Sequence, residues 1–249
     1  MSQPQQHSSS GAPAAALIDV RGLHSYYGAS HILRGIDLCV HRGETVGLMG
    51  RNGMGKSTLL KSIVGLLKPA RGSVHIAGRD MTGKSAYAVA HLGVAYVPEG
   101  RGIFGNLSVK ENLVMAARAG TQGQKNWTYE RVLETFPRLQ ERLGHGGQQL
   151  SGGEQQMLTI GRALMTNPDV LILDEATEGL APLIAKEIWR ICETIKQTGI
   201  SSVIVDKNHQ HVTRIADRNV ILVKGEVVFT GTSQELNAQP DLLVQYLGV

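Results

Sequence analysis

An octapeptide at residues 50–57, GRNGMGKS, constrains the fold of this chain more than any other feature. It fits the pattern G-x-x-x-x-G-K-[ST] and follows a strand-like run at residues 45–49. Apolar residues then recur at helical spacing, at Leu59, Leu60, Ile63, Val64 and Leu67. Between a strand and a helix, glycines let backbone N–H groups converge on phosphate oxygens, and the helix N-terminus adds partial positive charge. A plain glycine-rich turn would need neither flanking element, so the sequence predicts a polyphosphate-binding loop.

Two side chains of this loop have predicted chemical roles. Lys56 supplies a point charge for the β- and γ-phosphates of a nucleotide, and the Ser57 hydroxyl is placed to bind Mg²⁺. We therefore predict that Lys56 is both a binding and a catalytic residue. The whole loop is expected to contact the nucleotide through Gly50, Arg51, Asn52, Gly53, Met54, Gly55, Lys56, Ser57 and Thr58.

An acidic pair follows a continuous apolar run at residues 170–173, which is typical of a central strand. Asp174 ends that run, and a carboxylate at the end of a buried strand is costly unless a positive charge meets it. Mg²⁺ held by Ser57 is such a partner, so Asp174 is predicted to bind the metal. Glu175 points elsewhere and is predicted to be the general base that polarises an attacking water. The alternative is a pair of surface acids, which the upstream phosphate loop argues against.

A second candidate phosphate site is the segment LSGGEQQ at residues 150–156. Ser151 is predicted to cap a helix, and Gly152 and Gly153 permit close backbone approach to an anion. With Glu154, these residues form another helix terminus of phosphate-binding type. Two such termini can serve one nucleotide if they come from different subunits. A simple capped helix start is the alternative, but this segment stands between the loop and the acidic strand.

Composition limits the classes of protein that the chain can represent. Its 249 residues, 42% of them apolar, can bury one substantial core. The net charge is +4, but the sequence contains no dense run of basic residues of the kind that binds nucleic acid. Cys39 and Cys192 are too few for a disulfide framework, which favours a reducing compartment. No apolar stretch approaches the ~20 residues that span a bilayer, so we expect a protein that is soluble or peripheral through a partner. Residues 1–16 lack the pattern of a secretory signal and are predicted to be a disordered tail.

Strand-like and helix-like segments alternate, which predicts a mostly parallel sheet covered on both faces. Residues 108–165 are expected to be mainly helix, with a capping box at residues 108–111 and an interruption before Ser151. A later helix is expected from about residue 183, with Leu183, Ile184, Ile188, Ile191 and Ile195 on one face. The strand-like runs lie at residues 17–20, 36–40, 72–78, 94–97 and 202–205, with a hairpin at 220–223 and 227–230.

With the phosphate loop, LSGGEQQ and acidic strand in this order, the chain resembles the ATP-binding subunits of ABC transporters over residues 17–249. Segments at residues 96–101 and 178–182 are similar to the branched-chain amino acid importers. The resemblance implies an α/β fold of the P-loop NTPase (RecA-like) class, with an antiparallel β subdomain and an inserted helical subdomain at about residues 97–160. It also implies ATP and Mg²⁺ as cofactors, and location at the cytoplasmic face of a cell membrane, in bacteria the inner membrane.

The resemblance further implies roles for residues and partners. Tyr27 occupies the position of a ring that stacks on adenine, although Tyr26 could be the stacking ring and Tyr27 a core residue. Two ATP-binding subunits form a head-to-tail sandwich, in which each ATP lies between one phosphate loop and the partner's segment equivalent to residues 151–154. The helical subdomain then contacts transmembrane permease subunits, and closure on ATP drives their conformational change. A solute-binding protein is an indirect partner.

Three positions depart from the family pattern. Glu99 stands at a metal-side lid position usually held by Gln, and residues 178–181 replace Ser-Ala-Leu-Asp, so that an acid is missing. Lys207 stands where a His usually contacts the γ-phosphate, although His209 could reach that place through a shifted loop. Lysine accepts no hydrogen bond, so the chain's own site is predicted to hydrolyse ATP slowly and to work in a heterodimer.

Other classes explain the sequence less completely. A soluble ABC-type ATPase acting on DNA or ribosomes usually has long insertions or two cassettes, and a P-loop kinase or GTPase leaves LSGGEQQ unexplained. The transported solute is not encoded in this chain. Branched-chain amino acids are the first choice by resemblance, and urea, amides or other small solutes are the alternatives.

Overall fold

The computed structural model describes residues 16–248. The tail predicted over residues 1–16 lies outside the described residues except for Ala16, which belongs to the first strand. The assignment of Ala16 to the tail was therefore wrong. Among the residues that the structure describes, no helix is long and apolar enough to cross a membrane.

A six-stranded sheet forms the centre of the described chain, in the order β10-β9-β3-β8-β7-β6. Every neighbouring pair is parallel except β10 and β9, which form the predicted antiparallel hairpin. In the middle of the sheet, β3, β7 and β8 are buried along their whole length, which explains the continuous apolar run of β7. The strands are β3 (Thr45–Met49), β6 (Val94–Val97), β7 (Val170–Asp174), β8 (Ser201–Val205), β9 (Arg218–Val223) and β10 (Glu226–Thr232).

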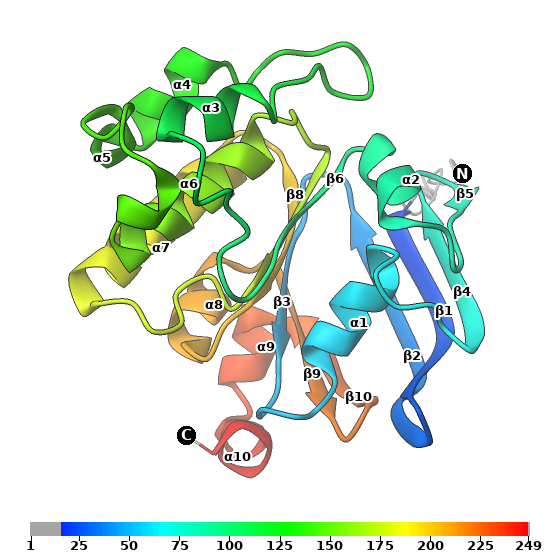
Figure 1. Ribbon diagram of the computed structural model, residues 1–249. Coiled ribbons are helices and arrows are strands. Elements are labelled where there is room, and N and C mark those ends of the chain that lie inside the picture. Colours follow the sequence, from blue (N-terminus) through cyan, green and yellow to red (C-terminus); the bar gives the residue numbers. More distant parts are fainter. Residues whose placement is uncertain (1–15, 249) are drawn as a thin grey trace, which may run out of the picture.

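A second, antiparallel sheet packs beside the first in the order β2-β1-β4-β5 (Figure 1). Its strands are β1 (Ala16–Tyr27), β2 (Ser30–His41), β4 (Arg71–Ile76) and β5 (Arg79–Asp80). The short runs predicted before the phosphate loop are thus two paired strands of 12 residues each. Helix α1 (Lys56–Ile63) lies between the two sheets and shares one apolar core with both. It ends at Ile63, so Leu67 of the predicted helical stripe lies beyond it.

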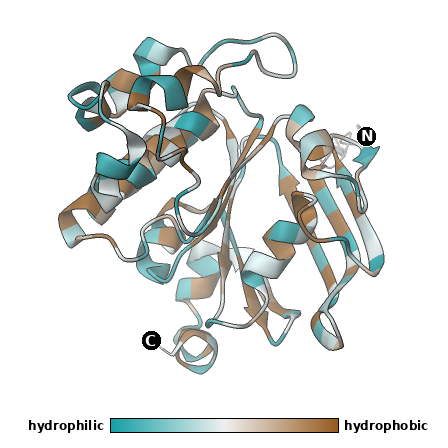
Figure 2. Ribbon diagram, in the orientation of Figure 1, coloured by the Kyte–Doolittle hydropathy of each residue, from teal (hydrophilic) through white to brown (hydrophobic). Residues whose placement is uncertain are grey.

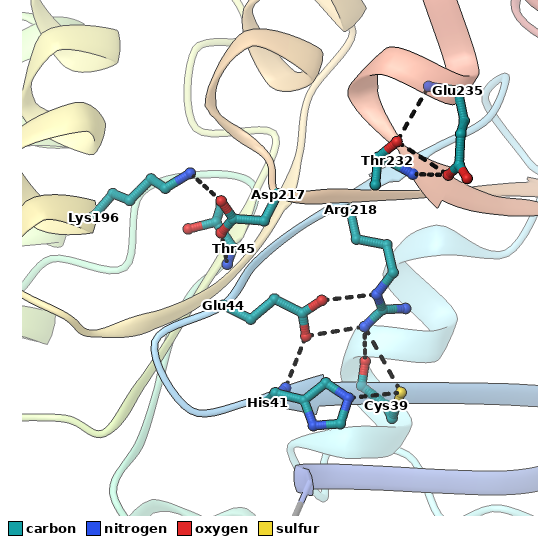
Figure 3. A network of polar contacts seen from close by, with 9 residues as sticks. All are labelled: Cys39, His41, Glu44, Thr45, Lys196, Asp217, Arg218, Thr232 and Glu235. Carbon is teal, nitrogen blue, oxygen red and sulfur yellow. Dashed lines mark hydrogen bonds and ion pairs between the residues drawn. The ribbon is translucent and has the colours of Figure 1, made fainter. Parts of the chain in front are cut away.

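A polar network ties the antiparallel sheet to the central one (Figure 3). Arg218 of β9 donates two hydrogen bonds to the Glu44 carboxylate, at 2.7 and 3.0 Å, and a third to the Cys39 carbonyl at 2.7 Å. Both members of the ion pair are largely buried. This two-point contact is the strong form of an ion pair, because it fixes the guanidinium plane as well as the charge.

The predicted helical region covers one end of the central sheet (Figure 1). The residues between α3 and α4 form turns, so the prediction of a mainly helical segment was only partly right. Gly120 and Gly123 interrupt this stretch, and Asn167 holds it in place by accepting the Trp127 backbone N–H at 2.7 Å. The helices are α3 (Val109–Val114), α4 (Tyr129–Thr135), α5 (Pro137–Gln140) and α6 (Gly152–Leu164), with a 3₁₀ turn at Gly147–Gln149.

The remaining helices complete the layers around the strands. They are α2 (Ala86–His91), α7 (Pro182–Gln197), α8 (His209–Ile215), α9 (Ser233–Asn237) and α10 (Pro240–Leu242), followed by a π-helical turn at Leu243–Leu247. Helix α7 buries Ile188, Ile191 and Ile195 of the predicted apolar face, but Leu183 in its first turn is 81% exposed. In Figure 2 the apolar residues concentrate on the strands at the centre of the molecule.

Candidate functional site

The predicted phosphate loop lies at the carboxyl end of β3, where a cavity of about 370 Å³ opens beside it. Gly50, Gly53 and Gly55 have φ values of +143°, +78° and +105°, so the loop uses conformations that other residues rarely adopt. The cavity is lined by residues of β2, of the loop and the start of α1, and of the segments that follow β6 and β7. They are Ile32, Asn52, Gly53, Gly55, Lys56, Ser57, Thr58, Glu99, Glu175 and Glu178.

Of the loop residues predicted to bind the nucleotide, three do not line this cavity, namely Gly50, Arg51 and Met54. Arg51 Nη2 donates to the Gln245 carbonyl at 3.3 Å, and the Met54 carbonyl accepts the Gly225 N–H at 3.0 Å. These two residues therefore contact the C-terminal part of the chain instead.

Lys56 is folded back over its own loop. Its Nζ donates to the carbonyl oxygens of Gly50 at 2.7 Å and Arg51 at 3.1 Å. Burial lowers the pKa of Lys56, while the Glu175 and Asp174 carboxylates oppose that shift. The ammonium group is thus held close to the cavity by weak neutral acceptors, and a phosphate would offer it a stronger, charged acceptor.

Asp174 ends β7 and is only 1% exposed. Its Oδ1 accepts the Ser57 hydroxyl at 3.1 Å, so the two predicted metal ligands lie in contact. Its Oδ2 accepts the Tyr96 hydroxyl at 2.9 Å, and no ion pair found in residues 16–248 includes Asp174. A buried carboxylate beside a hydroxyl, without a cationic side chain, fits a hard cation such as Mg²⁺, which prefers oxygen ligands.

The sequence did not single out Tyr96 as a site residue. It lies on β6, opposite Ile172 of β7, so the parallel pairing of these strands places its ring near the end of β7. Burial, and then the Asp174 carboxylate, raise the pKa of Tyr96, which keeps its hydroxyl a donor. A tyrosine inside an otherwise apolar strand was the available signal.

Glu175 lies in a compact group of charged side chains with Glu99, Glu178 and Lys207. One carboxylate oxygen from each of the three acids lies within 4.8 Å of the others, and all three residues line the cavity. Lys207 Nζ pairs with Glu178 and lies 3.9 Å from Glu175 Oε2. Burial, and then a hydrogen bond that the protonated Glu175 donates to the Glu178 carboxylate, raise the pKa of Glu175 to about 7, a value suited to a general base. The sequence identified Glu178 and Lys207 as separate departures, and the structure shows that they are partners.

The backbone holds this group in place. Glu175 has a φ of +51°, and its N–H donates to the Val205 carbonyl at 2.8 Å. The Thr177 hydroxyl donates to Asp206 at 2.6 Å, which connects the loops that follow β7 and β8. His209 begins α8 and is not among the residues that line the cavity in the described part of the chain.

The aromatic residues before β2 have different surroundings. Tyr26 stacks on His31, with ring centroids 4.3 Å apart and planes 6° from parallel. Tyr27 is 48% exposed, so the alternative that it is a core residue is wrong. Neither ring is among those that line the phosphate-loop cavity within residues 16–248.

The LSGGEQQ segment forms the predicted capped helix start. The Ser151 hydroxyl accepts the Glu154 N–H at 3.3 Å, and the Glu154 carboxylate accepts the Ser151 N–H at 2.8 Å. A Cβ on Gly153 would lie 2.4 Å from Cγ2 of Ile184, so this glycine is required for α6 to pack against α7. In the described part of the chain, the cavity lining does not include Ser151, Gly152, Gly153 or Glu154. Ser151 itself is exposed.

Comparison with known proteins agrees with this geometry. The family model described as ABC transporter matches residues 33–178. The branched-chain amino acid transport ATP-binding protein BraG of Pseudomonas aeruginosa is 39% identical over 90% of this chain and 96% of its own length. The probable branched-chain amino acid transport ATP-binding protein LivF of Archaeoglobus fulgidus is 36% identical over 86% of this chain and 91% of its own length.

More distant similarities extend to other transport systems. The lipopolysaccharide export ATP-binding protein LptB of Acidithiobacillus ferridurans is 31% identical over 93% of this chain and 97% of its own length. Among solved structures, the ADP conformation of an ATP-binding cassette of an ABC transporter has a TM-score of 0.80 at 25% identity, covering 95% of this chain and all of that one.

Proposed function

The chain belongs to the ABC transporter family, whose ATP-binding subunits hydrolyse ATP and act with transmembrane permeases, and we propose that it powers uptake of branched-chain or related amino acids. The similarity to BraG over nearly the full length of both chains is the observation that carries the choice of solute. Urea, amides or another small polar solute are the alternatives. We place the protein at the cytoplasmic face of the cell membrane, with a solute-binding protein as an indirect partner.

ATP and Mg²⁺ fit the cavity beside the phosphate loop. Ser57 and Asp174 would hold the metal, which supplies positive charge to the β- and γ-phosphates. Lys56 would exchange its two carbonyl acceptors for phosphate oxygens, and the loop N–H groups would bind the remaining oxygens. Glu175, with its pKa near 7, would accept the proton of the attacking water.

A second ATP-binding subunit is needed to use the helix start at Ser151. Its capping box is complete and its glycines are placed at the N-terminus of α6, yet this terminus contributes nothing to the chain's own cavity. We propose that it closes on the ATP held by a partner's phosphate loop. The Lys207 departure favours a heterodimer, in which the partner supplies the faster site.

The slow local site can be tested in the assembled transporter. Lys207 offers only donors and is paired with Glu178, so it does not replace an acceptor that orients water. Loss of such a positioned group typically costs about 10²- to 10⁴-fold in rate. We expect Glu175→Gln in this chain to leave most ATPase activity, and the equivalent change in the partner to abolish it. Near-complete loss from Glu175→Gln would show that the local site performs the turnover.

A permease helix could dock in a second cavity, of about 360 Å³, between α2, β6 and α6. Leu66 on its lining is 58% exposed, and Tyr87 on α2 is 74% exposed. We expect Leu66→Glu to prevent co-purification with the permeases, because a charge would replace exposed apolar surface at the docking site. Val244→Glu, at a 61% exposed C-terminal position, is the matched control and should assemble normally.

The solute is tested by reconstituting the chain with the permease subunits that co-purify with it. ATP-dependent uptake of leucine, with none of urea or acetamide, would support the proposal, and the reverse pattern would favour the alternatives. Tight, salt-sensitive binding of the isolated chain to heparin would instead favour a nucleic-acid function.

A further inference from the structure

The turn that joins β9 and β10 lies between the phosphate loop and β2. Gly225 in this turn is buried, and it makes one hydrogen bond to each side. Its N–H donates to the Met54 carbonyl at 3.0 Å, and its carbonyl accepts the Arg34 N–H at 2.8 Å. The adjacent Lys224 N–H points to the Met54 sulfur at 3.1 Å. Gly225 therefore bridges the phosphate loop and β2, although it lies 170 or more positions from both in the sequence.

Only glycine fits this bridge. Gly225 has a φ of +81°, and a Cβ there would lie 1.8 Å from the Ile32 carbonyl oxygen. Since that oxygen is backbone, no side-chain rotation can relieve the overlap. Any larger residue must move the turn away from β2 and from Met54.

The other side of β2 contacts the loop directly. Ile32 lines the phosphate-loop cavity, and a Cβ on Gly55 would lie 3.0 Å from Cδ2 of Leu33. The loop itself is rich in glycine, which loses more conformational freedom on ordering than any other residue. Contacts that order it before ligand arrives reduce the entropy cost of binding. Gly225 and β2 supply such contacts at the centre of the loop.

We propose that Gly225 is a positioning residue for the nucleotide, holding Met54 and thereby the loop N–H groups in their phosphate-binding arrangement. This proposal rests on ATP being the ligand of the cavity. It assigns the β9–β10 turn a role in ATP affinity, although the turn touches neither the cavity nor the acidic strand.

The test compares Gly225→Ala with Gly199→Ala. Gly199 has the same φ of +81°, but no atom lies within 4 Å of its would-be Cβ, so the control carries the same backbone strain without the overlap. Calorimetric titration with Mg²⁺ and ATP is done on the full chain, at a temperature where circular dichroism shows each variant folded. We expect Gly225→Ala to raise the Kd for ATP about tenfold or more, and Gly199→Ala to stay within about twofold of wild type. In an assembled transporter whose partner carries the Glu→Gln change equivalent to Glu175→Gln, the residual ATPase activity reports this chain's own site, and there Gly225→Ala should raise KM for ATP while kcat stays within about twofold.

Arg34→Pro is a milder change, because it removes one hydrogen bond of the same bridge and leaves Gly225 in place. It removes the N–H that Gly225 accepts, and β2 is an edge strand, where proline is tolerated. We expect a Kd increase of about threefold. Equal Kd values for Gly225→Ala and Gly199→Ala would overturn the proposal, and if Gly225→Ala does not fold, a wild-type Kd for Arg34→Pro would do so. A wild-type chain that binds no ATP would instead refute the proposed function itself.

Discussion

Replacing Tyr96 by Phe tests whether the buried Asp174 carboxylate depends on the Tyr96 hydroxyl. Tyr96 donates to one carboxylate oxygen at 2.9 Å and Ser57 to the other at 3.1 Å, while Asp174 is only 1% exposed. A hydrogen bond to a charged group contributes about 1.5–3 kcal/mol to the free energy of unfolding. For a chain of this size, each kcal/mol changes Tm by about 2–4 °C. We therefore expect Tyr96→Phe to lower the Tm of the metal-free and nucleotide-free protein by about 3–12 °C.

The same variant tests the metal role of Asp174 through thermal unfolding with and without Mg²⁺ and ATP. A bound cation would replace the lost donor as the partner of the carboxylate, so the Tm difference should shrink at saturating Mg²⁺ and ATP. Tyr87→Phe is the control, because that ring is 74% exposed and its hydroxyl can be hydrated. An unchanged Tm without Mg²⁺, or a deficit of the same size with it, would refute the reasoning.

Three further changes have calculable effects on stability, each measured by urea unfolding. Burial raises the pKa of Glu175 in the folded state from 4.5 to about 7, so the wild-type protein loses stability as pH rises through this range. The free energy of unfolding of metal-free Glu175→Gln, relative to wild type, should therefore increase between about pH 5 and pH 8, and a difference that does not change with pH would contradict this. Arg218→Ala leaves the largely buried Glu44 without its ion-pair partner and should lower the free energy of unfolding by about 3 kcal/mol or more. Arg138→Ala removes an exposed ion pair and should lower it by about 1 kcal/mol or less, so losses of similar size in the two variants would refute this reasoning. Phe136→Ala, at a fully buried position among the helices, should cost about 3–5 kcal/mol, and a loss under about 1 kcal/mol would show that this core is loosely packed.

Local sequence patterns predicted the elements whose determinants lie within a few residues. The capping boxes at Ser108 and Ser151 are present because the capping hydroxyl and the Glu three residues later satisfy each other's backbone groups. The buried run before Asp174 became β7 because a fully covered parallel strand needs continuous apolar sequence. In these places the sequence contains the whole interaction.

Long-range contacts could not be predicted in this way. Nothing near Tyr96 in the sequence indicates that its hydroxyl meets Asp174, since the strand order decides that contact. Gly225 looked like an ordinary hairpin glycine, although its essential neighbours are Ile32 and Met54. Leu183 continues the apolar stripe of α7 but lies in the exposed first turn of that helix. Apolar periodicity alone does not show which turns of a helix are covered by the rest of the protein.

The two departures at Glu178 and Lys207 show how structure changes the interpretation of a sequence difference. Taken alone, Lys207 is a missing hydrogen-bond acceptor and Glu178 is an extra acid. Together they form an ion pair, and Glu178 also accepts a hydrogen bond from the protonated Glu175. A third carboxylate beside Glu99 and Glu175 would be repulsive without Lys207, so each residue makes the other tolerable. The pair also influences the pKa of Glu175, the proposed general base. A change at Lys207 alone would therefore alter Glu175 as well as position 207, and Glu178 and Lys207 must be varied together to separate these effects.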